Sequence, residues 1–94
     1  MQYKFDIKYE RSKKKILKRV QIEKIEQTEL LFQEDPSHPK LEQKSIVCRR
    51  DNNKKSIRVL GNDGFRILIS IRGDIVYFQD IMDHDKYDRL TKDC

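Results

Sequence analysis

The chain has 94 residues, with 21 Lys or Arg against 16 Asp or Glu, which leaves a formal net charge of +5 with His neutral. This length is that of one small domain spanning residues 1–94, too short to enclose a large cofactor within several layers. Charged residues make up 39% and hydrophobic residues 36% of the sequence, so only a small core is available. These values favour a binding module, or a site on an exposed sheet face, over a large-cofactor enzyme.

The sequence contains no apolar stretch near the roughly 18 residues that a membrane span needs. Its first residues, MQYKFDIKYE, lack the apolar region of a signal peptide. We therefore expect a cytoplasmic protein that does not enter a membrane. The positive charge raises the expectation of a polyanionic partner.

The first half of the chain predicts a strand followed by two helices. Apolar residues occupy every second position of residues 3–9, which is the period of a strand with one buried face. Residues 10–34 contain no Gly or Pro, and their apolar residues have helical spacing. The apolar face shifts between Val20 and Ile22, which favours two helices joined by a tight turn over one rod. Two prolines within residues 35–39 then end the helical region.

The second half predicts an antiparallel sheet. Four short β-rich runs occur at residues 45–50, 56–60, 65–71 and 75–81. Turn-forming residues separate them at 51–53, 61–64 and 72–74, and Gly73-Asp74 suits a two-residue type II′ hairpin loop. The polar residues 83–94 are expected to form a tail of one or two helical turns. The predicted fold class is therefore α+β, with a two-helix hairpin covering one face of an antiparallel meander.

A dense basic segment lies in the first predicted helix. It comprises Arg11, Lys13, Lys14, Lys15, Lys18 and Arg19, with no acidic residue among them. On a helix these residues would form a basic ridge, the name used below for this set. Two interpretations stay open, a solvated helix face and a surface that grips the phosphates of a nucleic acid.

Two arginines are predicted to face each other on the sheet. If the apolar residues of the runs at 56–60 and 65–71 share the core face, Ile57 pairs with Ile67, and Arg58 then lies opposite Arg66. Like charges in that position are unfavourable unless an acid or an anion lies between them. Asp80 on the next run is one candidate acid. The alternative is a phosphate cradle, because guanidinium groups match phosphate oxygens.

A third feature follows the last predicted strand, in the stretch Asp83-His84-Asp85-Lys86-Tyr87. His84 and Tyr87 are close enough in sequence to bring an imidazole and a phenol to one edge of the sheet. No Cys or His spacing typical of a metal site is present, so no metal is predicted.

Together these features resemble the RelE/ParE superfamily of bacterial toxin–antitoxin toxins. The resemblance rests on the element order and on three stretches of sequence. The first is the break at Asp35-Pro36, followed by Pro39-Lys40-Leu41. The second is a predicted hairpin made of Ile57-Arg58-Val59 and Gly64-Phe65-Arg66-Ile67-Leu68-Ile69. The third is the stretch at residues 83–87. They are similar to the family's I-R-V … Y-R-I-L-Y hairpin and its terminal H-R-x-x-x-Y.

The resemblance implies a type II toxin that acts as a ribosome-dependent mRNA endoribonuclease without metal or cofactor, since the RNA's own 2′-OH attacks the adjacent phosphorus. It implies that Arg66 holds the scissile phosphate and Arg58 supports it. His84 would transfer a proton, and Tyr87 would stack on a base or orient the 2′-OH. The implied partners are a cognate antitoxin, mRNA and the ribosome. The alternative is a non-catalytic ParE-like toxin that binds gyrase or another protein.

Overall fold

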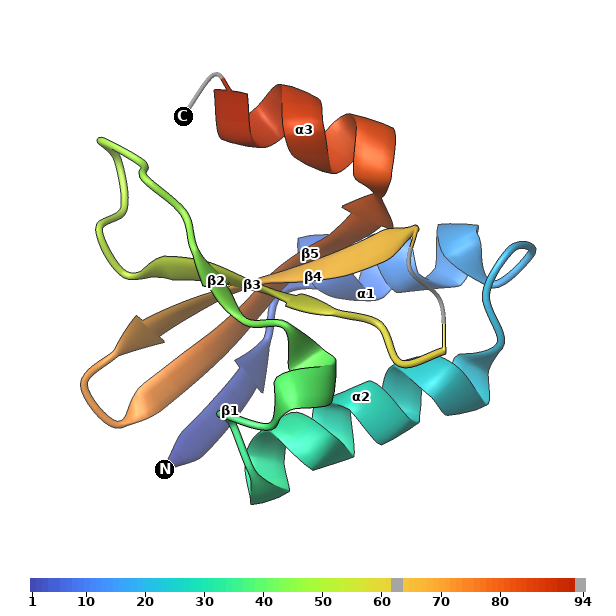
Figure 1. Ribbon diagram of the computed structural model, residues 1–94, viewed down its shortest axis with the longest axis horizontal. Coiled ribbons are helices and arrows are strands. Elements are labelled where there is room, and N and C mark those ends of the chain that lie inside the picture. Colours follow the sequence, from blue (N-terminus) through green and yellow to red (C-terminus); the bar gives the residue numbers. More distant parts are fainter. Residues whose placement is uncertain (62–63, 93–94) are drawn as a thin grey trace.

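The computed structural model describes residues 1–61 and 64–92, in which a mixed five-stranded sheet has helices on both faces (Figure 1). In chain order the elements are β1 (Gln2–Phe5), α1 (Ile7–Ile16), α2 (Ile22–Glu34), the 3-10 turn η1 (Pro39–Leu41), β2 (Lys44–Ser45), β3 (Lys54–Arg58), β4 (Phe65–Arg72), β5 (Ile75–Asp83) and α3 (His84–Lys92). The strands are ordered β1-β5-β4-β3-β2 across the sheet. The α+β class, the helical hairpin and the meander from β2 to β5 are thus confirmed.

The N-terminal boundary differs from the prediction. The strand expected over residues 3–9 ends at Phe5, and α1 begins at Ile7. Tyr9 is fully buried from its place in this helix, whereas Ile7 is largely exposed, so the alternation did not mark one strand face. β1 pairs in parallel with β5, which the sequence pattern did not indicate. Alternation of apolar and polar residues over only seven positions does not distinguish one strand from a shorter strand followed by the first turn of a helix.

The strands of the second half also differ in length from the predicted runs. In place of the first run, expected over residues 45–50, the strand β2 comprises only Lys44 and Ser45 and so begins one residue earlier. The tail forms a nine-residue helix, longer than the expected one or two turns. The β4–β5 hairpin has the predicted two-residue loop, with Arg72 paired to Ile75 and Gly73 at φ 60°. The turn predicted at 61–64 includes positions 62 and 63, which lie outside the described residues.

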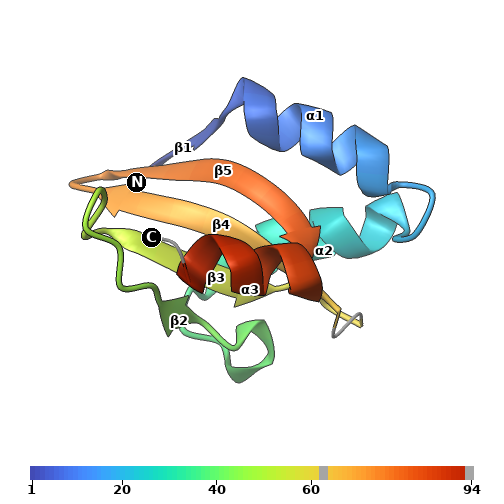
Figure 2. The same ribbon diagram turned by 90° about the horizontal axis from the view of Figure 1, so that it is seen from above.

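The two faces of the sheet bury different sets of side chains. On one face, α1 and α2 cover the main core, in which Tyr9, Ile25 and Phe32 pack against Ile67 and Phe78 of the sheet. On the other face, a smaller cluster forms around Leu68 and Met82, with Tyr87 of α3 packed against it. Figure 2 shows α3 in front of the sheet, on the side away from α2. The second face is less completely covered, because no residue of α3 is buried. Within residues 1–61 and 64–92, no helix has the length and apolar character to cross a membrane.

The loop between β2 and β3 is anchored over this second face by Asp51. Its carboxylate accepts a hydrogen bond from the Ser70 hydroxyl at 2.9 Å and pairs with Arg72 at 3.2 Å. Burial by itself would raise the pKa of Asp51, but hydrogen bonds from the Asn53 N–H, Ser70 and Arg72 outweigh it and lower the pKa. The loop therefore holds a defined position above β4.

Candidate functional site

The predicted pairing of the two sheet arginines is confirmed. Ile57 pairs with Ile67 and Arg58 with Arg66, both arginines pointing to the face that carries α3. Arg66 is only 6% exposed. Its Nε donates to Ser56 Oγ at 3.1 Å, and its Nη2 donates to the Glu42 carbonyl oxygen at 2.6 Å. The guanidinium is therefore held in one orientation by two groups of the protein.

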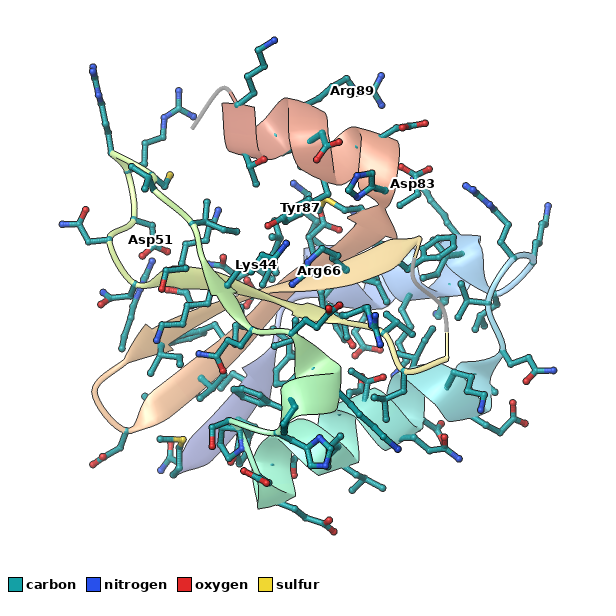
Figure 3. The ribbon with its side chains drawn as sticks, in the orientation of Figure 1. Lys44, Asp51, Arg66, Asp83, Tyr87 and Arg89 are labelled. Atoms are coloured by element: carbon teal, nitrogen blue, oxygen red, sulfur yellow. The ribbon has the colours of Figure 1, made fainter. Side chains whose placement is uncertain are left out.

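Tyr87 lies next to this guanidinium, and His84 lies next to Tyr87. The centre of the Arg66 guanidinium is 5.4 Å from the centroid of the Tyr87 ring, and the Tyr87 hydroxyl is 3.0 Å from Ser56 Oγ. The His84 ring stacks on the Tyr87 ring, with centroids 6.5 Å apart and planes at 26°. Figure 3 shows Arg66 and Tyr87 between the sheet and α3. Three of the predicted site residues thus form one contiguous group, called the Arg66–Tyr87–His84 stack below.

The acid that separates the two arginines is Glu42 and not Asp80. Glu42 Oε2 lies 2.8 Å from Arg58 Nη1, while its carbonyl binds Arg66. Glu42 follows η1 with φ 43°, in the left-handed region that non-glycine residues seldom occupy. Asp80 instead lies 3.5 Å from Lys8 Nζ and 4.0 Å from Lys86 Nζ, so its assignment to the arginines was wrong. Sequence reasoning missed Glu42 because it belongs to a loop with no periodic pattern.

The start of α3 positions His84. Asp83 Oδ1 accepts a hydrogen bond from the Lys86 N–H at 2.9 Å, as an N-cap does, and Oδ2 pairs with Arg19 at 3.1 Å. The Lys86 hydrogen bond and then the Arg19 interaction lower the pKa of Asp83 below its ordinary value. His84 is exposed, and its Nε2 lies 3.2 Å from Asp88 Oδ2 one turn along the helix. The imidazole therefore reaches solvent while a carboxylate orients it.

Replacing Asp83 with Ala is expected to speed amide hydrogen exchange in the first turn of α3 about five-fold, since loss of an N-cap costs about 1 kcal/mol. Asp83→Asn is the matched control, because Asn keeps a capping oxygen. The pKa of Asp83 is lowered on folding, so its charge stabilises the helix fully above the unfolded value of about 3.9, and that stabilisation is lost as pH falls through the folded pKa. With a side chain that is 33% exposed, the ionic part is screened and small. Equal exchange in wild type and Asp83→Ala at neutral pH would show that Asp83 does not cap α3.

The basic ridge is divided by the fold. Lys13 is only 16% exposed, pairs with Glu29 at 3.1 Å, and lies over the ring of Tyr9. Glu29 also accepts a hydrogen bond from the Tyr9 hydroxyl at 2.6 Å, and burial together with the charge of Glu29 raises the pKa of Tyr9 far above its ordinary value. Arg19 pairs with Asp83 and stacks on Phe65, although it stays largely exposed. The remaining members are exposed, namely Arg11, Lys14, Lys15 and Lys18.

Within residues 1–61 and 64–92, no group of three His, Cys, Asp or Glu side chains is placed so that it could hold a metal ion. The chemistry available at the Arg66–Tyr87–His84 stack is charge stabilisation, aromatic stacking and proton transfer.

The arrangement of a helical hairpin on one face of a mixed sheet and a third helix on the other is shared with solved structures of toxins. The structure is similar to YafQ from E. coli strain BL21(DE3), with a TM-score of 0.76 and 9% identity over 90% of this chain and 94% of that one. It is similar to a copper-bound mutant toxin from Helicobacter pylori, with a TM-score of 0.70 and 8% identity over 92% and 97% of the two chains.

A third similar structure is the RelB-RelE antitoxin-toxin complex from Methanococcus jannaschii, with a TM-score of 0.61 and 20% identity over 93% of this chain and 96% of that one. No protein-family model and no curated protein matches the sequence. At these identities the likeness establishes the fold, and the chain has the fold of RelE-like toxins.

Proposed function

We propose that the protein is the toxin of a type II toxin–antitoxin pair and that it cleaves mRNA on the ribosome, in the cytoplasm and without a metal or cofactor. The observation that carries this proposal is the Arg66–Tyr87–His84 stack on the less covered face of a RelE-like fold. Similar structures include a Helicobacter pylori toxin and the E. coli DinJ-YafQ toxin-antitoxin complex.

In the proposed reaction the RNA's 2′-OH attacks the adjacent phosphorus, and the 5′-oxygen leaves as the 2′,3′-cyclic phosphate forms. Arg66 stabilises the charge on the phosphorane, and its orientation is set in advance by Ser56 and the Glu42 carbonyl. Nε and Nη2 of this guanidinium are held by the protein, and Nη1 is the nitrogen proposed to donate to a phosphate oxygen. His84 acts as the general acid or base, oriented by Asp88.

The other two predicted residues have supporting roles in this proposal. Tyr87 offers a ring on which an RNA base stacks, or a hydroxyl that orients the 2′-OH. Arg58 is shared with Glu42 and grips a flanking phosphate. The exposed lysines of the basic ridge attract the RNA backbone without regard to sequence.

The cognate antitoxin is proposed to bind the helical hairpin. Ile7, Leu17 and Leu30 are 73%, 43% and 57% exposed on α1, its C-cap and α2. Ile7 and Leu17 lie on the segment that also carries the basic ridge, and Leu30 lies on the other helix of the hairpin. A partner segment with apolar and acidic residues would therefore complement this surface.

One observation favours the non-catalytic, ParE-like alternative. Arg66 is 6% exposed and already holds two protein groups, so both sheet arginines contribute to the fold as well as to any site. A toxin that acts by binding gyrase or another protein would need them only for that structural role.

Induction of the protein in a bacterial host tests the proposal. We expect growth arrest, relief of the arrest by a small acidic protein encoded next to this chain, and a complex of the two on size-exclusion chromatography. Primer extension should reveal new 5′ ends within translated messages. Normal growth together with a monomer that captures no such protein contradicts the toxin proposal. Arrest with intact messages and altered DNA supercoiling would favour the ParE-like alternative.

A further inference from the structure

A cavity of about 480 Å³ lies on the same sheet face as the Arg66–Tyr87–His84 stack. Leu68 and Asp80 form its sheet side, Ile46 comes from the loop after β2, and Leu90 comes from α3. Cavities of this volume match small-molecule sites. Leu68 is two residues beyond Arg66 on β4, so the cavity begins about 7 Å from that arginine.

A β-bulge shapes the polar end of this cavity. Leu68 pairs with Asp80 but the next residue, Ile69, pairs with Phe78, so Gln79 is an extra residue in β5. In a regular strand neighbouring side chains point to opposite faces. Here Phe78 and Ile81 both enter the main core, and the two residues between them, Gln79 and Asp80, both line the cavity.

Each of these two side chains has one buried oxygen that accepts no hydrogen bond from the described residues. Asp80 is 2% exposed, and its Oδ1 accepts the Ile81 N–H at 2.9 Å. Asp80 Oδ2 and Gln79 Oε1 are buried and have no hydrogen-bond partner in the described part of the chain. The ammonium groups nearest to Oδ2, those of Lys8 and Lys86, stay 3.5 Å and 4.0 Å away in the ion pairs described above. Buried acceptors that lack donors are costly, which indicates a ligand that donates.

The rest of the lining complements a nucleotide. Ile46, Leu68 and Leu90 provide apolar walls for a flat ring, and Arg50 and Lys54 supply positive charge for a phosphate. Guanine is the one RNA base whose Watson–Crick edge carries two adjacent donor groups, N1–H and the 2-amino group. A carboxylate and an amide oxygen at the end of the cavity match that edge.

We propose that this cavity binds a guanine nucleotide, with Asp80 and Gln79 accepting from the base and the basic residues holding its phosphate. The inference deepens the proposed function by naming the base that the enzyme reads next to the scissile phosphate. It makes Asp80 and Gln79 specificity-determining residues, distinct from Arg66 and His84.

Titration of the full chain with mononucleotides, followed by amide NMR, tests the site. We expect GMP to shift the signals of Leu68, Gln79, Asp80 and Leu90. IMP, which lacks the 2-amino group, should bind several-fold more weakly, and AMP, whose N1 is an acceptor, about ten- to a hundred-fold more weakly. Equal affinities for GMP and AMP, or shifts confined to other surfaces, would overturn the proposal.

Two variants and a control separate base recognition from folding. Asp80→Asn places an amide donor where Oδ2 accepts and should reduce GMP affinity about ten- to a hundred-fold, whereas Gln79→Ala should reduce it about two- to ten-fold. Asp74→Asn, in the exposed β4–β5 turn, should bind GMP as the wild type does. If the amide NMR spectrum of Asp80→Asn loses the dispersion of a folded protein, the affinities of the wild type and Gln79→Ala for GMP, IMP and AMP decide whether the proposal holds. A folded Asp80→Asn that still prefers GMP would refute the assignment.

The outcome is distinguishable from that of the proposed function. If the cleaved messages show no guanosine at a fixed distance from the cleaved bond, the proposal that the cavity reads this base is wrong, and the nuclease proposal still holds. GMP binding by a protein that cuts no message would retain the pocket and remove the nuclease.

Discussion

Arg66→Ala and His84→Ala are each expected to reduce mRNA cleavage sharply while the protein stays folded. Removing a preorganised charge donor such as Arg66 lowers a rate by about 10²–10³-fold. Loss of a general acid or base such as His84 lowers it by about 10²–10⁴-fold. Arg58→Ala should have a smaller effect, because Arg58 is proposed to grip only a flanking phosphate and is shared with Glu42. Primer extension on translated message measures the effect.

The controls follow from the contacts of each residue. Arg66→Ala leaves Ser56 Oγ and the Glu42 carbonyl without their donor, so circular dichroism must establish that the variant folds, and Arg66→Lys keeps the charge with less disruption. His38→Ala removes the other histidine of the chain, which accepts from the Lys40 N–H at η1, and should cleave at the wild-type rate. Folded Arg66→Ala and His84→Ala variants with full toxicity, and a wild type that cuts no message, would contradict the nuclease proposal.

Replacing Lys14, Lys15 and Lys18 with Ala is expected to weaken RNA binding and flatten its dependence on salt. If each lysine neutralises one phosphate, the slope of log affinity against log salt falls by about 0.7 per residue, or roughly 2 in total. Filter binding across a series of salt concentrations measures this slope. Stability should change little, because all three lysines are exposed.

The fold supplies two controls for this experiment. Lys4 and Lys40 are exposed lysines outside the basic ridge, and replacing them should leave the slope unchanged. Lys13→Ala should mainly lower stability, because Lys13 is half-buried against Glu29 and Tyr9. An unchanged slope in the triple variant would identify the ridge as a solvated helix face.

Much of the candidate site follows from short-range pattern. The apolar residues of β3 and β4 recur with a period of two, and a slip of one residue would turn them all to the wrong face, so the pattern alone determined that Arg58 lies opposite Arg66. The helical hairpin was predictable for a similar reason, since a shift in the apolar face between Val20 and Ile22 requires a new helix axis. Local periodicity records which side chains are buried.

Contacts between distant segments were decided only by the tertiary structure. Glu42 reaches both arginines because the loop after η1 passes over β3 and β4, and nothing periodic marks that path. The bulge at Gln79 turns two neighbouring side chains to one face, which no regular strand pattern predicts. Lys13 is in the predicted ridge by sequence but is drawn to buried Glu29, 16 residues away. A burial pattern specifies which face a residue occupies, whereas its charge partner depends on where the chain brings a second segment.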